Sequence, residues 1–192
     1  MLIIGITGTL GAGKGTVVEY LVGEKGFRHF SVRHFLLEII RKRYLPENRN
    51  SMFLIANELR ATFGPSYVTD QLYLQAAASD QPCIIESIRT TGEIVSLRQK
   101  GDFYLFAVDA LPEIRFQRIR LRNSVTDDIS YETFLEQEER EMHTSDPGVQ
   151  NLAGCREMAD FVLSNNGEKT ALFRQVETAL ARIKAKGSPS GE

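Results

Sequence analysis

The feature that most constrains this chain is a glycine-rich segment near its amino terminus. An apolar, β-branched run at residues 2–7, Leu-Ile-Ile-Gly-Ile-Thr, is typical of a buried strand. Residues 8–16, Gly-Thr-Leu-Gly-Ala-Gly-Lys-Gly-Thr, follow directly, and helical spacing of apolar residues comes next. A strand, a glycine loop with a lysine and a helix together form the context of a phosphate-binding loop. The alternative is a glycine-rich turn with a chance lysine, and the flanking strand and helix argue against it.

Each part of this loop has a chemical reason to be there. Glycines let consecutive backbone N–H groups point at an anion, and the following helix adds its partial positive charge. Lys14 can reach the β- and γ-phosphates of ATP, and the Thr16 hydroxyl can meet Mg²⁺. The residues predicted to bind ATP are Gly8, Thr9, Leu10, Gly11, Ala12, Gly13, Lys14, Gly15 and Thr16. A dinucleotide-binding G-x-G-x-x-G pattern is a rival, but the glycines of this loop do not have its spacing.

The end of the loop carries a family resemblance. Gly-Lys-Gly-Thr at residues 13–16, in place of Gly-Lys-Ser or Gly-Lys-Thr, resembles the nucleoside monophosphate kinase branch of P-loop proteins, which includes adenylate kinase. Those enzymes typically carry proline where this chain has Leu10. The resemblance covers nearly the full chain, and residues 86–89 and 158–165 favour relatives of dephospho-CoA kinase. It implies ATP as the donor, Mg²⁺ as the cofactor and a small nucleotide-like phosphate acceptor.

Composition limits the other classes of protein. The length of 192 residues suggests one domain, and 42% hydrophobic with 25% charged residues is ordinary for a globular chain. A net charge of -2 argues against nucleic acid as the main partner. No apolar run reaches membrane-spanning length, and the first one lacks the features of a signal peptide, so we expect a cytoplasmic protein with no membrane partner. Cys83 and Cys155 make no disulfide framework, and the oligomeric state stays open.

Strands and helices are expected to alternate along the chain. Strands are predicted at 2–7, 27–30, 82–86, 103–108 and 159–163, with helical patterns between them and at 168–186. This order predicts an α/β fold of the three-layer P-loop kinase type, with a five-stranded parallel sheet, helices on both faces and a short lid. The predicted organisation is a single domain at 1–186, an acceptor-binding helical segment at about 31–80, a lid at about 118–145 and a disordered tail at 187–192.

Ligands of such sheets bind at the carboxyl ends of the strands. The polar residues that end predicted strands are Gly8, Ser31, Glu86 and Asp109. Residues 86–89, Glu-Ser-Ile-Arg, resemble the D-G-x-x-R or D-G-x-R element of monophosphate kinases, with Glu for Asp and Ser for Gly. The resemblance implies that Glu86 helps to position Mg²⁺ and that Arg89 binds the acceptor phosphate. The extra methylene of Glu86 moves its carboxylate relative to the family pattern.

Arginines can supply the positive charge that phosphoryl transfer needs. Arg115, Arg118 and Arg122 are spaced by three and four residues, so they share one helix face, while Arg120 points elsewhere. Together with Val-Asp at 108–109 and a polar loop, this segment resembles the lid entrance of monophosphate kinases. The resemblance implies that arginines of this face fold over the nucleotide phosphates. The alternative is an ordinary basic surface.

Two arginines of the helical segment at 31–80 are further candidates. Arg60 lies where monophosphate binders place acceptor contacts, and Arg33 stands in a stretch where the Gly, Asp and Arg of adenylate kinase are replaced. For each, a surface ion pair is the alternative. The predicted site therefore comprises catalytic Lys14, Glu86, Arg118 and Arg122, substrate-binding Arg33, Arg60 and Arg89, and metal-binding Thr16 and Glu86.

Two functions of different classes follow from these residues. The first is an ATP-dependent kinase that moves the γ-phosphoryl group to a nucleotide-like acceptor, either a nucleoside monophosphate or dephospho-CoA. The second is a catalytically reduced, ATP-binding regulatory protein, which the replaced signature around Arg33 favours. A GTPase is disfavoured because the chain has no N-K-x-D motif.

Replacing Lys14 with alanine is expected to abolish ATP binding or turnover while the fold stays intact, because its charge serves phosphate and not the core. Calorimetric titration with ATP and a thermal melt measure the two effects separately. An unfolded variant, or one with full activity, would contradict the assignment of Lys14.

Overall fold

Parallel strands form the centre of the molecule. A computed structural model of the chain describes residues 1–121, 129–144, 146 and 148–187. Within these ranges one five-stranded sheet has the order β2-β3-β1-β4-β5, and every neighbouring pair is parallel. The strands are β1 (Ile3–Thr7), β2 (Arg28–Ser31), β3 (Cys83–Glu86), β4 (Phe103–Asp109) and β5 (Phe161–Ser164). The predicted α/β fold and its five-stranded parallel sheet are confirmed.

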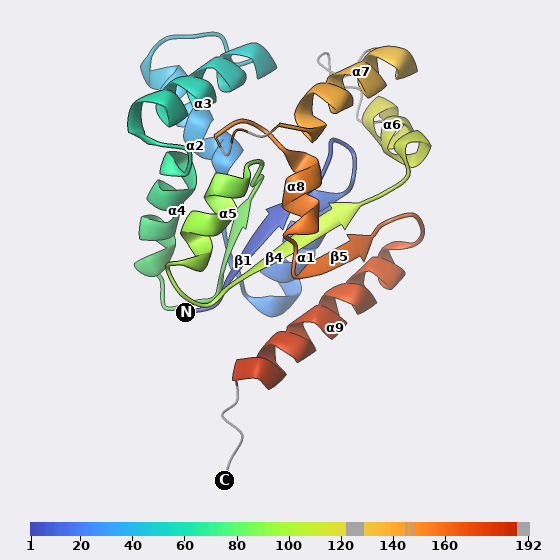
Figure 1. The fold of residues 1–192 in the computed structure, drawn as a ribbon. Coiled ribbons are helices and arrows are strands. Elements are labelled where there is room, and N and C mark those ends of the chain that lie inside the picture. Colours follow the sequence, from blue (N-terminus) through green and yellow to red (C-terminus); the bar gives the residue numbers. More distant parts are fainter. Residues whose placement is uncertain (122–128, 145, 147, 188–192) are drawn as a thin grey trace.

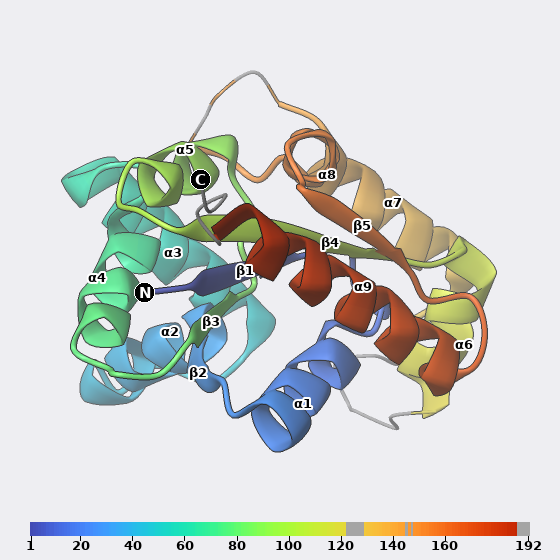
Figure 2. The ribbon, with the colours of Figure 1, turned by 90° about the horizontal axis from the view of Figure 1, so that it is seen from below.

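Helices cover both faces of this sheet, so the molecule has three layers. They are α1 (Lys14–Lys25), α2 (Val32–Lys42), α3 (Arg49–Phe63), α4 (Tyr67–Ala77), α5 (Thr91–Arg98), α6 (Pro112–Leu121), α7 (Tyr131–Met142), α8 (Leu152–Glu157) and α9 (Lys169–Gly187). Figure 2 shows α1 and α9 on one face and α5 and α8 on the other. At the end of the sheet where β1 and β4 point, α2 and α3 stand on one side and α6 and α7 on the other (Figure 1).

Two apolar cores lie on the two faces of the sheet. Side chains of a strand alternate between faces, so a strand buried on both sides must be apolar throughout. Ile3 joins the core beneath α2, α3, α4 and α5, whereas Ile4 and Ile6 join the core beneath α1 and α9. This explains the unbroken apolar run that begins the chain. Within the described part of the chain, no helix combines the length and apolarity needed to cross a bilayer.

Local capping explains where the helices differ from the sequence prediction. The sequence predicts a helix from Met52, but α3 begins at Arg49 because the Asn48 side chain caps it and accepts a hydrogen bond from the Ser51 N–H at 2.9 Å. Helix α8 is not predicted at all, because its six residues are too few to show a helical period. Asn151 caps it in the same way, with the Gly154 N–H donating at 2.8 Å.

Two predicted segments lie partly outside the described residues. Of the predicted tail at 187–192, only Gly187 is described, and it ends α9. The predicted lid at 118–145 is described at 118–121 and 129–144, and Arg122 lies outside the described residues.

A buried ion pair ties α3 to α5. The Arg60 guanidinium lies 3.3 Å from the Glu93 carboxylate, and their side chains are only 6% and 1% exposed. The same carboxylate accepts hydrogen bonds from the backbone N–H groups of Arg89, at 2.8 Å, and Thr90, at 3.1 Å. Glu93 therefore holds the segment after β3 against α3 through three donors.

Replacing Glu93 with glutamine is expected to lower the free energy of unfolding by about 3 kcal/mol, because it leaves the Arg60 charge buried without a countercharge. Urea denaturation measures this loss. The matched control is Glu58→Gln, which breaks the solvent-exposed pair between Arg43 and Glu58 and should leave stability within experimental error. Equal losses in the two variants would show that the buried Arg60–Glu93 pair stabilises the fold no more than an exposed pair does.

Candidate functional site

The predicted phosphate loop, residues 8–16, joins the end of β1 to the start of α1. Two of its glycines are required by close approaches of other backbone and side-chain atoms. At Gly8, where φ is +143°, a Cβ would lie 2.3 Å from the Val108 carbonyl oxygen. At Gly13, where φ is +98°, a Cβ would lie 2.1 Å from Nδ2 of Asn165. No other residue type fits these positions, so the loop follows a path that only this glycine pattern allows.

The loop presents positive charge and unsatisfied polar groups. Lys14 Nζ donates to the carbonyl oxygens of Gly8, at 2.8 Å, and Thr9, at 3.0 Å, so its ammonium group lies over the loop. Within the described ranges, no side chain forms a capping hydrogen bond at the start of α1. The hydroxyl oxygen of Thr9 is buried without a hydrogen-bond partner among the described residues. An anion bound at this helix start would accept a hydrogen bond from the Thr9 hydroxyl and would be stabilised by the charge of Lys14.

Asn165 and Arg118 hold the loop from the side of β5 and α6. Asn165 is 5% exposed, and its side-chain amide donates to the Ala12 carbonyl oxygen at 2.9 Å. Arg118 donates from Nη2 to the Asn165 carbonyl oxygen at 2.8 Å, while its Nη1 is buried with no partner among the described residues. Arg118 thus lies close to the loop, and its catalytic role stays a prediction. Asn165 follows β5 directly. It could have been identified from the sequence as a polar residue at the carboxyl end of a strand, where ligands of such sheets bind.

Arg115 has a different environment from the one its spacing predicts. It is 3% exposed, donates from Nε to the Ala110 carbonyl oxygen at 2.7 Å and pairs with the Glu138 carboxylate at 2.8 Å. The expected shared phosphate-facing surface is therefore wrong for Arg115. Helix α7, which supplies Glu138, packs against α6 and removes this side chain from solvent.

Glu86 ends β3 close to the phosphate loop. His29 on β2 lies 3.1 Å from its carboxylate through Nε2. Burial raises the pKa of Glu86, but the His29 hydrogen bond and the charges of His29, Lys14 and Arg89 outweigh burial, and the net pKa is lowered. The carboxylate is therefore ionised at neutral pH. Its oxygens and the Thr16 hydroxyl are the hard oxygen donors that Mg²⁺ prefers.

The residue after Glu86 keeps an unusual backbone conformation. Ser87 has a φ of 74°, a left-handed value that favours glycine. Its N–H and that of Ile88 both donate to the Ile6 carbonyl oxygen, at 3.0 and 3.1 Å. The chain thus adopts the turn that glycine would adopt here, although the residue is serine, and Glu86 stays beside β1.

Arg89 is held by α7 and by the segment that precedes α8. Its Nη1 donates to the Glu141 carboxylate at 2.8 Å and to the Gln150 side chain at 3.3 Å. Next to this group is a cavity of about 510 Å³ between α3 and α7, which we call the α3–α7 cavity. Its lining residues are Asn50, Phe53, Asn57, Gln137, Arg140, Glu141, Val149 and Gln150. The sequence predicts a role for Arg89 but for none of these lining residues.

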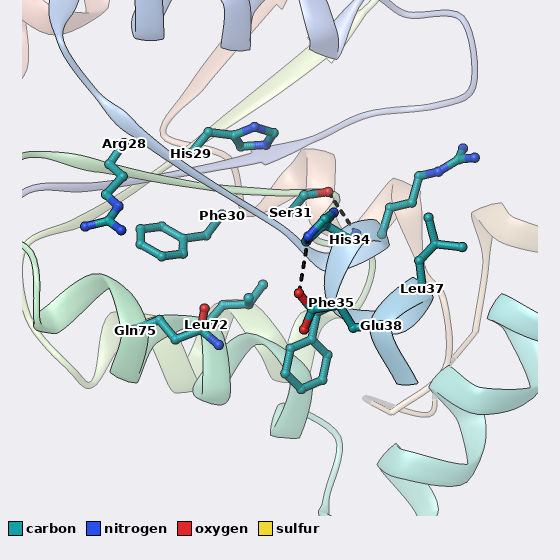
Figure 3. Close-up of a pocket in the computed structure, with 11 residues that line it drawn as sticks. Arg28, His29, Phe30, Ser31, His34, Phe35, Leu37, Glu38, Leu72 and Gln75 are labelled. Atoms are coloured by element: carbon teal, nitrogen blue, oxygen red, sulfur yellow. Dashed lines mark hydrogen bonds and ion pairs between the residues drawn. The ribbon is translucent and has the colours of Figure 1, made fainter. Parts of the chain in front are cut away.

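The two remaining predicted arginines lie apart from the loop. Arg60 is buried with Glu93, and that carboxylate also binds the Arg89 N–H. Exposed Arg33 lines a different cavity of about 510 Å³ at the free edge of β2, between α2 and α4. In Figure 3, Leu72 and Gln75 of α4 face Phe30 across this edge cavity. The structure therefore brings together Lys14, Glu86, Arg89 and Arg118, while acceptor binding by Arg33 and Arg60 stays a prediction.

Replacing His29 with alanine is expected to raise the pKa of Glu86, because burial then acts with less opposition. Carbon-detected NMR of the carboxyl group measures this pKa directly. His34→Ala is the control, since exposed His34 pairs with Glu38 instead.

The same shift has a defined effect on stability. A carboxylate whose pKa is lower in the folded state stabilises the fold above its unfolded pKa, and that contribution is lost as pH falls through the folded value. In His29→Ala the folded pKa of Glu86 moves up towards its unfolded value, so this contribution shrinks and less stability is lost on acidification. An unchanged Glu86 pKa in this variant would refute the proposed role of His29.

Comparisons with known proteins agree with this arrangement. Residues 4–144, which include the phosphate loop, match the model of a family described as an AAA domain. A UPF0200 protein from Methanothermobacter thermautotrophicus is 28% identical over 192 residues, and the match covers 99% of this chain and 95% of that protein.

Solved structures share the fold. A gluconokinase from Sinorhizobium meliloti 1021 has a TM-score of 0.60 at 13% identity, covering 96% of this chain and 94% of that one. Shikimate kinase from Bacteroides thetaiotaomicron has a TM-score of 0.55 at 13% identity, covering 95% and 98%. At such identities the likeness shows the fold alone, which this chain shares with these two kinases.

Proposed function

This chain belongs to the AAA domain family, and from that premise we propose that it is an ATP-dependent kinase acting on a small nucleotide-like acceptor. The acceptors we consider are nucleoside monophosphates and dephospho-CoA. The observation that carries the proposal is the pair of buried, unsatisfied polar atoms at the loop, Thr9 Oγ1 and Arg118 Nη1. Buried polar atoms are nearly always satisfied, so a phosphate group that accepts from both explains why they are tolerated.

The chain's own residues can do most of the work of phosphoryl transfer, which consists of positioning and charge stabilisation. The loop backbone and Lys14 would hold the β- and γ-phosphates, and Arg118 would stabilise charge on the transferred group. Thr16 and Glu86 are the residues that would hold Mg²⁺, directly or through water. Mg²⁺ held there would neutralise negative charge on the phosphates.

The acceptor is assigned to the α3–α7 cavity. Four of its side chains are carboxamides, which can both donate to and accept from the edge of a nucleobase: Asn50, Asn57, Gln137 and Gln150. The Phe53 ring is 51% exposed and offers a face for stacking. Arg89 lies beside the cavity and would exchange the Glu141 carboxylate for the acceptor phosphate. A sugar acid would leave the aromatic face unused, so this lining favours a nucleotide.

A screen of acceptors tests the proposal. ATP consumption is measured with Mg²⁺ and each nucleoside monophosphate, dephospho-CoA, gluconate or shikimate, with acceptor-free and Lys14→Ala reactions as controls. Turnover that depends on a nucleotide acceptor and is absent in the variant supports the kinase. Tight ATP binding without turnover on any acceptor would replace it with the regulatory ATP-binding function.

Arg118→Ala is expected to lower kcat by about 10³-fold with a much smaller change in ATP affinity, because an arginine on the transferred phosphoryl group acts mainly in the transition state. Lysine should rescue only partly, since it lacks the planar fork. Arg120→Ala on the exposed face of α6 is the matched control and should be nearly silent. Equal, mild and salt-screened losses at both positions would instead indicate an ordinary basic surface.

A further inference from the structure

Arg115 reaches the tip of the phosphate loop from α6. Its backbone packs so closely that a Cβ at Gly11 would lie 2.6 Å from the Arg115 carbonyl oxygen. Its Nη1 donates to the Leu10 carbonyl oxygen at 3.4 Å, and its Nε donates to that of Ala110 at 2.7 Å. The guanidinium is therefore fixed between the segment that precedes α6 and the loop.

Glu138 holds this guanidinium in place from α7. Its two carboxylate oxygens pair with Nη1 at 2.9 Å and Nη2 at 2.8 Å of Arg115, a two-pronged geometry that fixes the plane of the fork. The Phe134 ring lies under the guanidinium, with 5.3 Å between the Arg115 Cζ and the ring centroid. Glu138 is 23 residues after Arg115, so the pair ties α7 to the tip of the loop.

The direction of the loop's N–H groups follows from which carbonyl groups are held. In a planar trans peptide the C=O and N–H point in opposite directions. Arg115 draws the Leu10 carbonyl to one side, so the Gly11 N–H of the same peptide points the other way. The Asn165 amide holds the Ala12 carbonyl in the same way, so the Gly13 N–H points away from Asn165. Neither N–H has a partner within the part of the chain that the structure describes, so both are available to an anion.

We propose that Arg115 and Glu138 are positioning residues that keep the phosphate loop in its ATP-binding shape. The inference rests on the proposed function only as far as ATP binding. A purely packing role would be filled equally well by two apolar side chains, since a buried ion pair gives little net stability over such a replacement. The Leu10 carbonyl, however, needs a donor, which an apolar side chain does not supply.

The decisive variant replaces the pair with apolar residues of similar size, Arg115→Met with Glu138→Leu. Calorimetric titration of the full chain with Mg²⁺ and ATP gives the affinity, and a thermal melt without nucleotide gives the stability. We expect a melting temperature near that of the unmodified protein and an ATP affinity about tenfold weaker, the size of effect expected from loss of a charged hydrogen bond. Unchanged ATP affinity in this folded double variant would overturn the proposal.

Two further variants complete the experiment. Arg115→Lys keeps the buried charge beside Glu138 and loses the fork, so it should also bind ATP more weakly, and it decides the matter if the double variant does not fold. Glu139→Gln changes the next residue of α7, which is exposed, and should alter neither quantity. An unmodified protein that binds ATP but phosphorylates no acceptor would refute the kinase and leave this inference standing. One that binds no ATP would overturn both.

Discussion

The phosphate loop keeps its shape because two other parts of the chain pack closely against two of its glycines, where any larger residue would clash. The Val108 carbonyl approaches Gly8, and the Asn165 amide approaches Gly13. Val108 lies in β4 and Asn165 directly follows β5, and both strands lie on the same side of β1, since β4 pairs with β1 and β5 pairs with β4. The order of the sheet therefore determines which groups surround the loop, and the local glycine pattern makes their approach sterically permissible.

Each cation described around the loop already has an oxygen partner within the protein. Lys14 lies on loop carbonyl groups, Arg115 on Glu138 and Arg89 on Glu141. A phosphate that enters such a site exchanges partners instead of meeting bare charges, so affinity depends on the difference between two sets of contacts. Two single atoms differ from these groups: Arg118 Nη1 and Thr9 Oγ1 have no partner among the described residues, so a ligand there replaces no existing bond.

Much of this architecture follows from local patterns in the sequence. The buried strands, the loop and the closeness of Glu86 to Lys14 all come from short motifs and from the rule that parallel strands end at one edge. Arg115 and Arg118 show where such reasoning stops. Their spacing places both on one face of α6, but Glu138 buries the first and Asn165 engages only part of the second. Those partners are remote in the sequence, and a helical period carries no information about them.

The residues proposed to bind the acceptor were also hard to predict, because the sequence does not show which side chains become buried. Arg60 and Arg33 have the same charge and lie in the same predicted segment, yet one is enclosed with Glu93 and the other lines the edge of β2. The α3–α7 cavity was not predictable, since its residues come from segments far apart in the chain and half of them are amides without a motif. Tertiary packing, and not residue type, separates these cases.

The two carboxylates of α7 that bind arginines are three residues apart, about one turn of helix. Glu138 and Glu141 therefore lie on the same side of α7, one towards Arg115 and the other towards Arg89. Inserting or deleting a single residue between them would rotate one carboxylate by about 100° and break that pair. Changes in chain length before Tyr131 leave this register untouched. Related sequences should thus vary in length ahead of α7 but keep the three-residue spacing between these two carboxylates. That spacing then gives a fixed reference for aligning them.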